Sequence, residues 1–451
     1  MQARHIKSGE IRDIIINEAL TRLVMVQEYG LDNKLPVEDS FESLMFLGPP
    51  GVGKSALQYL AVKDVAGLLS EIRETRVKAE KVSIRISPQV ASEIVNGVVE
   101  GKVVPYVHLY LPQTKLWDLE GTPSPTDNYL EVQGVKVPYN LWRLDPFLIP
   151  LLDYTDRVRD PNKIVTPLLV LDEFNMGSRD VLRRLFQLAR GAELGRAKLN
   201  PYTVITLLGN PPELNIYAEE ELPEPLVNRA SRYMITSASL DGWLAFMNEV
   251  YGKKWSQEIG GFLLGNPTLL YYRDKSDKEV VITPRTWTTL SVRLYSLKMM
   301  VSKYKLIGRD KYWDNVEKLL YSHLTTDVAD ELYGFLRGLM AINLADIIKD
   351  PQKISSLDRN LVSYLLVKIT NYQMENYKRA DKETRESIIE KLTEIYRYAK
   401  KVIGAEALGI IVTSLPEPVR IKYAKLLRPE DREEIREIKR KIKEYEEALG
   451  V

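Results

Sequence analysis

The chain has 451 residues, 45% of them hydrophobic and 28% charged, and its 63 Lys and Arg residues balance 62 Asp and Glu residues. These values predict a globular protein of two or three domains, and a net charge of +1 gives no global field that would attract nucleic acid or an anionic membrane. With no cysteine the sequence excludes disulfides and thiolate metal sites, and His5, His108 and His323 are too scattered to suggest a zinc site.

The first part of the chain predicts an amphipathic helix. Over residues 10–29 an apolar stripe of Ile16, Leu20, Leu23 and Val24 follows the capping residue Ser8. No apolar run is long enough to span a bilayer, and no apolar segment typical of a secretory signal precedes this helix. We therefore expect a soluble, cytoplasmic protein with no membrane association.

The central motif is the stretch 44–57, in which an apolar run leads into Gly, four residues and then Gly-Lys-Ser before a helical pattern. This is the context of a phosphate-binding loop, whose glycines let backbone N–H groups turn toward phosphate oxygens. Lys54 can reach the β- and γ-phosphates of ATP, and the Ser55 hydroxyl can bind Mg²⁺ that arrives with the nucleotide. The expected nucleotide-binding residues are Gly48, Pro49, Pro50, Gly51, Val52, Gly53, Lys54, Ser55 and Ala56.

The next segment carries weaker signals. A helix is predicted over 56–69, and the charged stretch 71–81 is expected to extend or follow it on the surface. A second strand is predicted over 106–111. Residues 113–163 have the irregular pattern of an insertion made of loops and short strands.

A second motif is the apolar run 168–171 followed by Asp172 and Glu173, which predicts a buried parallel strand ending in two carboxylates. Asp172 can orient Mg²⁺ beside Ser55, and Glu173 can polarise a water toward the γ-phosphate. Because adjacent strand residues point in opposite directions, two separate roles are natural. The alternative interpretation is an acidic strand end with no chemical role.

A third strand end follows a predicted helix at 178–190 and a predicted short hairpin at 191–199. The strand 204–208 ends at Gly209-Asn210, so Asn210 is expected at the same sheet edge as Asp172. The alternative for Asn210 is a turn-forming residue before proline.

Three arginines complete the set of candidate residues. A short helix over 222–233 carries Arg229 and Arg232 into a last strand at 233–236, and beyond residue 241 the chain is almost all helix. Pro284 opens one of these helices and holds Arg285 at its start. The apolar spacing after Pro429 predicts a final amphipathic helix, with a short coiled coil as the alternative.

The set of motifs and their order resemble those of the AAA+ ATPases, and in particular the MoxR-like group of that superfamily. The motifs lie at 48–55, 171–175, 208–212, 226–229 and 283–287. The resemblance implies a Walker A motif over 48–55, a Walker B motif at Asp172 and Glu173, and sensor 1 at Asn210. It also implies an arginine finger at Arg229, with Arg232 as its rival, and sensor 2 at Arg285. Glu173, Asn210, Arg229 and Arg285 are thus the expected catalytic residues, and Ser55 and Asp172 the expected metal ligands.

The fold that the resemblance implies is α/β: a P-loop NTPase core with a parallel sheet flanked by helices, an α-helical lid and a helical extension. The expected domains are 1–240, with the insertion at about 113–163, then 241–345 and 346–451. The resemblance implies a homo-oligomer, most often a hexameric ring, that remodels or assembles a partner protein. MoxR-like proteins are often encoded beside von Willebrand factor A domain proteins, so such a protein is a possible partner. Two alternatives remain: a nucleic-acid-dependent motor and a nucleotide-gated scaffold without turnover.

Overall fold

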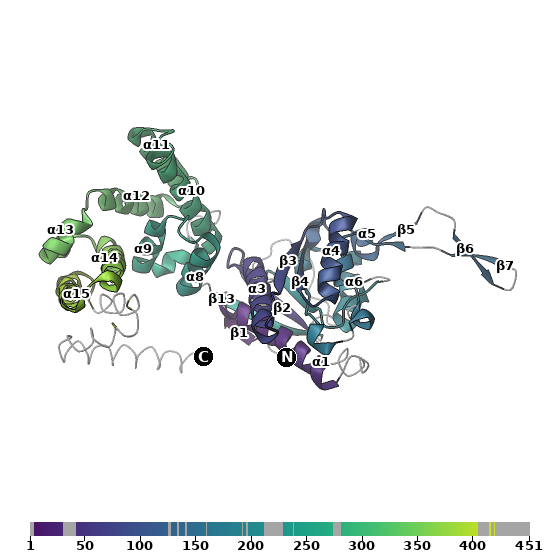
Figure 1. Ribbon diagram of the computed structural model, residues 1–451. Helices are drawn as coiled ribbons and strands as arrows, with labels where there is room; N and C mark the ends of the chain where they lie inside the picture. The colour runs from purple at the N-terminus through teal and green to yellow at the C-terminus, as the bar shows by residue number, and fades with distance from the viewer. Residues whose placement is uncertain are drawn as a thin grey trace. The chain divides into compact units, whose positions relative to one another are not determined.

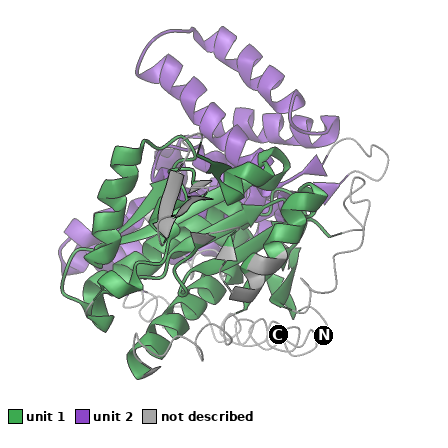
Figure 2. Cartoon of the chain, turned by 90° about the vertical axis from the view of Figure 1, so that its right-hand side faces the viewer, with its two compact units in different colours: residues 1–242 green, residues 243–451 purple. Residues whose placement is uncertain are grey.

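The computed structural model describes residues 4–29, 42–124, 128–132, 135–139, 142–158, 160–191, 193–194, 197–211, 229–237, 239–273 and 281–404, together with Leu415 and Val419. The chain divides into two compact units, residues 1–242 and 243–451 (Figure 2). The short helix expected over 222–233 is wrong at its carboxyl end, because residues 230–237 form a strand, β13 (Ala230–Ser237), that includes Arg232. The rest of that helix, over 222–228, and the helix expected after Pro429 lie outside the described residues. The division of the helical part at residue 345 stays a prediction.

The first unit is built on a parallel sheet (Figure 1). Its described strands have the order β1-β13-β2-β12-β9-β4-β3, and every neighbouring pair is parallel. The strands are β1 (Arg4–Lys7), β2 (Ser43–Leu47), β3 (Lys78–Val82), β4 (Val103–Tyr110), β9 (Leu168–Asp172), β12 (Val204–Gly209) and β13 (Ala230–Ser237).

The central strands of the sheet are buried on both faces. All residues of β2, β9 and β12 are buried, including those on alternate sides of the pleat. Continuous apolar runs of this kind are stable only where helices cover both faces of a sheet. The predicted parallel α/β sheet is confirmed.

Five helices of the described part belong to this unit: α1 (Glu10–Tyr29), α3 (Lys54–Ile72), α4 (Pro88–Val99), α5 (Leu116–Glu120) and α6 (Arg179–Gly191). Helix α1 packs on α3, where Arg12 forms an ion pair with Asp64, and α3 packs on the sheet.

The bounds of α1 confirm the predicted helix, but its predicted apolar stripe is wrong in part. Val24 is 55% exposed, and the buried face instead consists of Ile11, Ile15, Ala19, Leu23 and Val26. The predicted stripe and the buried face both have apolar residues at helical spacings of three and four. Periodicity alone therefore could not tell which of these two overlapping faces is buried.

The charged stretch 71–81 is the second correction. Helix α3 ends at Ile72, and the chain then forms β3, a strand at the sheet edge that pairs only with β4 among the described residues. An edge strand has one open side, so Lys78, Glu80 and Lys81 can reach solvent from it. The strand predicted from residue 106 begins earlier, at Val103, in register with β3.

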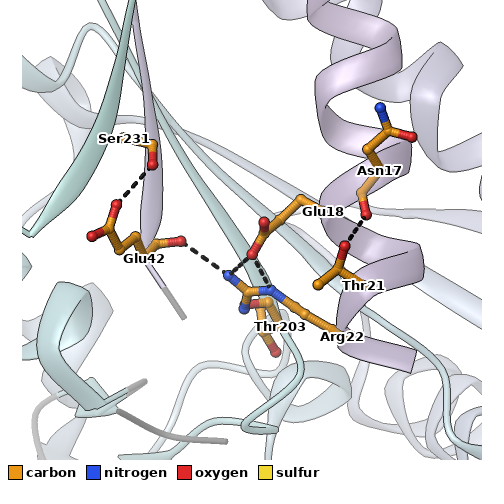
Figure 3. Close-up of polar contacts among 7 residues, drawn as sticks. All are labelled: Asn17, Glu18, Thr21, Arg22, Glu42, Thr203 and Ser231. Atoms are coloured by element: carbon orange, nitrogen blue, oxygen red, sulfur yellow. Dashed lines mark hydrogen bonds and ion pairs between the residues drawn. The ribbon is translucent and has the colours of Figure 1, made fainter. Parts of the chain in front are cut away.

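Arg22 of α1 bonds to the chain at the amino ends of β2 and β12 (Figure 3). Arg22 is 3% exposed, and its guanidinium donates to the carbonyls of Thr203 and Glu42 and to the carboxylate of Glu18. The side chain of Glu42 in turn accepts from Ser231. One buried cation thus joins α1 to the chain entering β2 and β12, at the edge of the sheet opposite to the strand ends that carry the motifs.

In the predicted insertion, the described residues form only short elements. They are α5, the 3₁₀ helices η1 (Leu111–Gln113), η2 (Ile149–Leu151), η3 (Thr155–Arg157) and η4 (Pro161–Lys163), and the antiparallel pairs β5 (Thr122–Pro123) with β8 (Trp142–Arg143) and β6 (Asn128–Val132) with β7 (Val135–Tyr139). After α6, the predicted hairpin is confirmed as β10 (Glu193–Leu194) and β11 (Ala197–Lys198).

The second unit is mainly helical, as predicted, although β14 (Tyr272–Arg273) and β15 (Val281–Ile282) form a short antiparallel pair. Thr283 caps α10 and Pro284 opens it, which confirms the predicted helix start. Among the described helices, none combines the length and the hydrophobicity that a membrane span requires. From residue 240 on, the helices within the described ranges are α8 (Leu240–Tyr251), α9 (Gln257–Gly265), η7 (Pro267–Leu270), α10 (Pro284–Ser302), α11 (Arg309–Tyr321), α12 (Thr326–Met340), α13 (Leu344–Lys349), η8 (Pro351–Ser356), α14 (Arg359–Arg379) and α15 (Lys382–Ile403).

Candidate nucleotide-binding site

The loop between β2 and α3 needs its glycines. Gly51 and Gly53 have φ values of 79° and 95°, in the left-handed region that a side chain disfavours. A Cβ on Gly48 would lie 2.7 Å from Cβ of Ile235, which is closer than packed atoms allow. The local geometry therefore explains why these positions lack side chains.

Helix α3 begins at Lys54, directly after the left-handed Gly53. The first N–H groups of a helix have no acceptor within the helix, and the helix dipole is positive at this end. The loop thus leads into a helix N-terminus of the kind that binds phosphate in other proteins.

The Lys54 ammonium is held against the loop. It is buried, and Nζ donates to the carbonyls of Gly48 at 2.7 Å and Pro49 at 3.1 Å and to Oδ1 of Asn210 at 3.0 Å. A phosphate oxygen placed in the loop can take over as acceptor, because the ammonium already points across it.

Asp172, at the end of β9, lies beside Ser55. Oγ of Ser55 donates to Oδ2 of Asp172 at 2.6 Å, and Nε2 of His108 lies 2.9 Å from the same oxygen. Burial raises the pKa of Asp172, but the hydrogen bonds from His108 and Ser55 outweigh it, so this pKa lies below the ordinary carboxyl value. The carboxylate is therefore ionised at neutral pH.

Glu173 does not continue the strand. Its φ of 52° places it in the left-handed region, from which the chain turns into η5 (Phe174–Met176). The prediction that strand pleating separates the two carboxylates is therefore wrong, because a sharp turn separates them instead. Such strained backbone at a residue other than glycine is a feature of functional sites.

Asn210 connects Lys54 to Glu173. Its Oδ1 accepts from Lys54, while its Nδ2 donates to Oε2 of Glu173 at 3.1 Å. The carbonyl of Asn210 accepts from Asn175 at 2.9 Å, so the turn after β9 is bonded to the end of β12. The structure thus brings Lys54, Glu173 and Asn210 into one hydrogen-bonded group.

Two residues that contact the candidate site, His108 and Asn175, were missed from the sequence. His108 was considered only as a scattered histidine, and Asn175 was not considered separately. The signal for His108 was its position as a polar residue near the end of the apolar run of β4. Its meaning depends on the pairing of β4 with β9, which places His108 opposite Val170, two residues before Asp172.

The arginines lie elsewhere. Arg229 stands at the amino end of β13, where its carbonyl accepts from the Ser43 amide. The carboxyl end of β2, at Leu47, is about 13 Å from Ser43, since four steps of about 3.3 Å separate the two residues. Arg232 lies within β13 opposite Met45 and is half-buried. Arg285 is exposed in the first turn of α10, in the second unit.

The donor atoms at Ser55 and Asp172 suit a hard cation. Mg²⁺ prefers oxygen ligands and is usually held by one or two carboxylates together with phosphate oxygens and waters. The described residues contain no group of three or more His, Asp or Glu side chains that could hold a metal on their own. The fit is therefore to an ion that arrives with a nucleotide.

No protein-family model and no curated protein matches the chain. Among solved structures, the Aeropyrum pernix ORC1 protein in complex with DNA matches at 12% identity over 89% of this chain and 82% of that one, with a TM-score of 0.32. The A. pernix ORC2 protein, solved as ADPNP-ADP complexes, matches at 15% identity over 87% and 92%, with a TM-score of 0.29. At such TM-scores neither likeness bears on the fold or the site of this chain.

Proposed function

We propose that the chain is an ATPase of the AAA+ type, which binds ATP with Mg²⁺ and hydrolyses it to ADP and phosphate. One observation carries the proposal: side chains from three segments of the sequence meet at the carboxyl ends of the parallel strands. They are Lys54, Ser55, Asp172, Glu173 and Asn210. A glycine loop alone would bind phosphate. A carboxylate pair and an amide beside it add the groups that hydrolysis needs.

Each side chain has a role that follows from its contacts. Lys54 binds the β- and γ-phosphates, and Ser55 and Asp172 hold Mg²⁺, which when bound neutralises the charge on the phosphate oxygens. Glu173 accepts a proton from the attacking water. Asn210 orients Glu173 through Nδ2 and contacts the Lys54 ammonium through Oδ1, so it relates phosphate binding to the position of the base.

The MoxR-like assignment and the hexameric ring belong to the same proposal. Arg229 lies at the amino end of β13, whereas the phosphate loop follows the carboxyl end of β2. The arginine is therefore at the opposite end of the strands from the phosphate loop of its own subunit, which supports a role in a neighbouring subunit. Hydrolysis would then depend on assembly, as it does in other enzymes with an arginine finger in trans. The work delivered is remodelling or assembly of a partner protein, with a von Willebrand factor A domain protein as the first partner to test.

The decisive experiment measures nucleotide binding and turnover on the full chain. Wild type is expected to bind ATP and release phosphate, whereas Lys54→Ala binds no ATP and Glu173→Gln binds ATP without turnover. Absence of ATP binding by wild type would overturn the proposal. Binding without turnover would favour a nucleotide-gated scaffold, and turnover that requires DNA would favour a nucleic-acid motor.

A further inference from the structure

The carboxylate of Asp172 accepts three hydrogen bonds from described residues. Oδ2 accepts from Ser55 at 2.6 Å and from His108 at 2.9 Å, and Oδ1 accepts from the Glu173 amide at 3.0 Å. A carboxylate oxygen only accepts, so Nε2 of His108 carries the proton in this contact. The carboxylate would have a partner on each oxygen without His108.

The three donors differ in what else they do. The Ser55 hydroxyl is itself an expected ligand of Mg²⁺, and the Glu173 amide belongs to the strained turn that carries the proposed base. His108 alone among them comes from a regular strand, β4, and the proposed function gives it no contact with nucleotide or ion. It is thus the donor that can keep the carboxylate in place while the other two adjust.

The ring of His108 is itself fixed. It lies 6.3 Å from the ring of Tyr106, which is fully buried and lies 5.2 Å from the ring of Tyr59 on α3. These separations are typical of packed aromatic pairs. The parallel register adds a second constraint, because it places His108 and Asp172 on the same face of neighbouring strands.

We propose that His108 is a positioning residue for the metal: its Nε2–H holds Oδ2 of Asp172, so that the carboxylate is oriented for Mg²⁺ before MgATP binds. The proposal rests on the proposed function, since it concerns the same site. Hydrogen-bond partners of metal ligands commonly change metal affinity by about 10–100-fold when they are removed.

The test compares the affinity for ATP with Mg²⁺ and with EDTA, measured with a fluorescent ATP analogue on the full chain. His108→Ala is expected to weaken binding of the magnesium complex by about 10–100-fold and to change metal-free binding less than about twofold. His108→Gln is expected to restore much of the loss, since its amide nitrogen can reach the place of Nε2. His108→Asn, whose amide is shorter, is not.

Controls separate this role from a structural one. His323→Ala removes a histidine whose ring contacts Ser322 and the Leu319 carbonyl in the second unit, and it should leave both affinities unchanged. Thermal unfolding of each variant reports stability. Equal losses with and without Mg²⁺, no loss in His108→Ala, or equal effects of the Gln and Ala variants would overturn the role of His108. Failure of wild type to bind ATP would instead overturn the proposed function.

Discussion

The Lys54 ammonium donates a hydrogen bond to Oδ1 of Asn210, 156 residues further along the chain, at 3.0 Å. Through its other amide atom Asn210 holds Glu173. When a phosphate binds the Lys54 ammonium, it competes with Oδ1 of Asn210 for the same donor. Phosphate binding therefore affects the side-chain amide that orients the proposed base, Glu173. This relationship allows ATP binding and hydrolysis to be tested separately.

Removal of the ammonium should abolish ATP binding. Lys54→Ala deletes a buried cation that can make two or more charge-assisted hydrogen bonds to phosphate, each worth roughly 1.5–3 kcal/mol, so the affinity should fall about 100-fold or more. Isothermal titration with ATP measures the loss. The matched control is Lys63→Ala, on the exposed side of the same helix, where Lys63 lies over the ring of Tyr59. Wild-type affinity in Lys54→Ala would refute the assignment of the loop.

Removal of the base should separate chemistry from binding. Glu173→Gln keeps an oxygen that can accept from Asn210 but cannot take a proton from water, so turnover should fall by about 10²–10⁴-fold while ATP still binds. Phosphate release measures turnover. Glu74→Gln is the matched control, since Glu74 also has a positive φ, of 50°, in an exposed turn. Undiminished turnover in Glu173→Gln would show that another group takes the proton from the attacking water.

Arg229 should act in a neighbouring subunit. Arg229→Ala subunits are expected to bind ATP but to lose turnover by about 10³–10⁵-fold, which is the range for an arginine finger. Mixed with Glu173→Gln subunits they should recover activity, because some interfaces then pair an intact base with an intact arginine. Phosphate release as a function of the mixing ratio measures the recovery.

Subunit exchange, followed with labelled protein, is the control for that mixing experiment. Confirmed exchange without recovery would contradict a role in trans. The same series with Arg232→Ala tests the rival arginine, and recovery seen only there would move the assignment to Arg232.

The second unit offers a prediction about pH. Burial raises the pKa of Glu258, but the ion pair with Lys298 and a hydrogen bond from Ser256 outweigh it, and the pKa lies below the ordinary value. A depressed pKa in the folded state stabilises the protein above the unfolded-state pKa of about 4.3. This stabilisation should be lost as the pH falls through the folded-state value.

The measurement is urea unfolding, followed by tryptophan fluorescence between pH 3 and 7. Glu258→Gln should be less stable at pH 7 by about 1–2 kcal/mol and should lose part of the acid dependence. Glu394→Gln on the exposed side of α15 is the matched control. The same acid dependence in Glu258→Gln and wild type would show that other carboxylates cause it.

Elements with local signals could be predicted from the residues alone. The glycine spacing predicted the loop at 48–55, the apolar run predicted β9 with Asp172 at its end, and Thr283-Pro284 predicted the start of α10; each of these elements is present. Such features depend on φ preferences, caps and continuous burial, which neighbouring residues express directly. Asn210 could also be placed at the correct edge, because parallel strands end together.

The order of the strands in the sheet could not be predicted in this way, and it determines which site residues meet. β12 lies between β2 and β9, so Asn210 can contact both Lys54 and Glu173, and β4 lies beside β9, so His108 reaches Asp172. Pairing between strands far apart in the chain leaves no local pattern. For the same reason the sequence missed the charged strand β3 at the sheet edge, because a strand with one open side needs no apolar run.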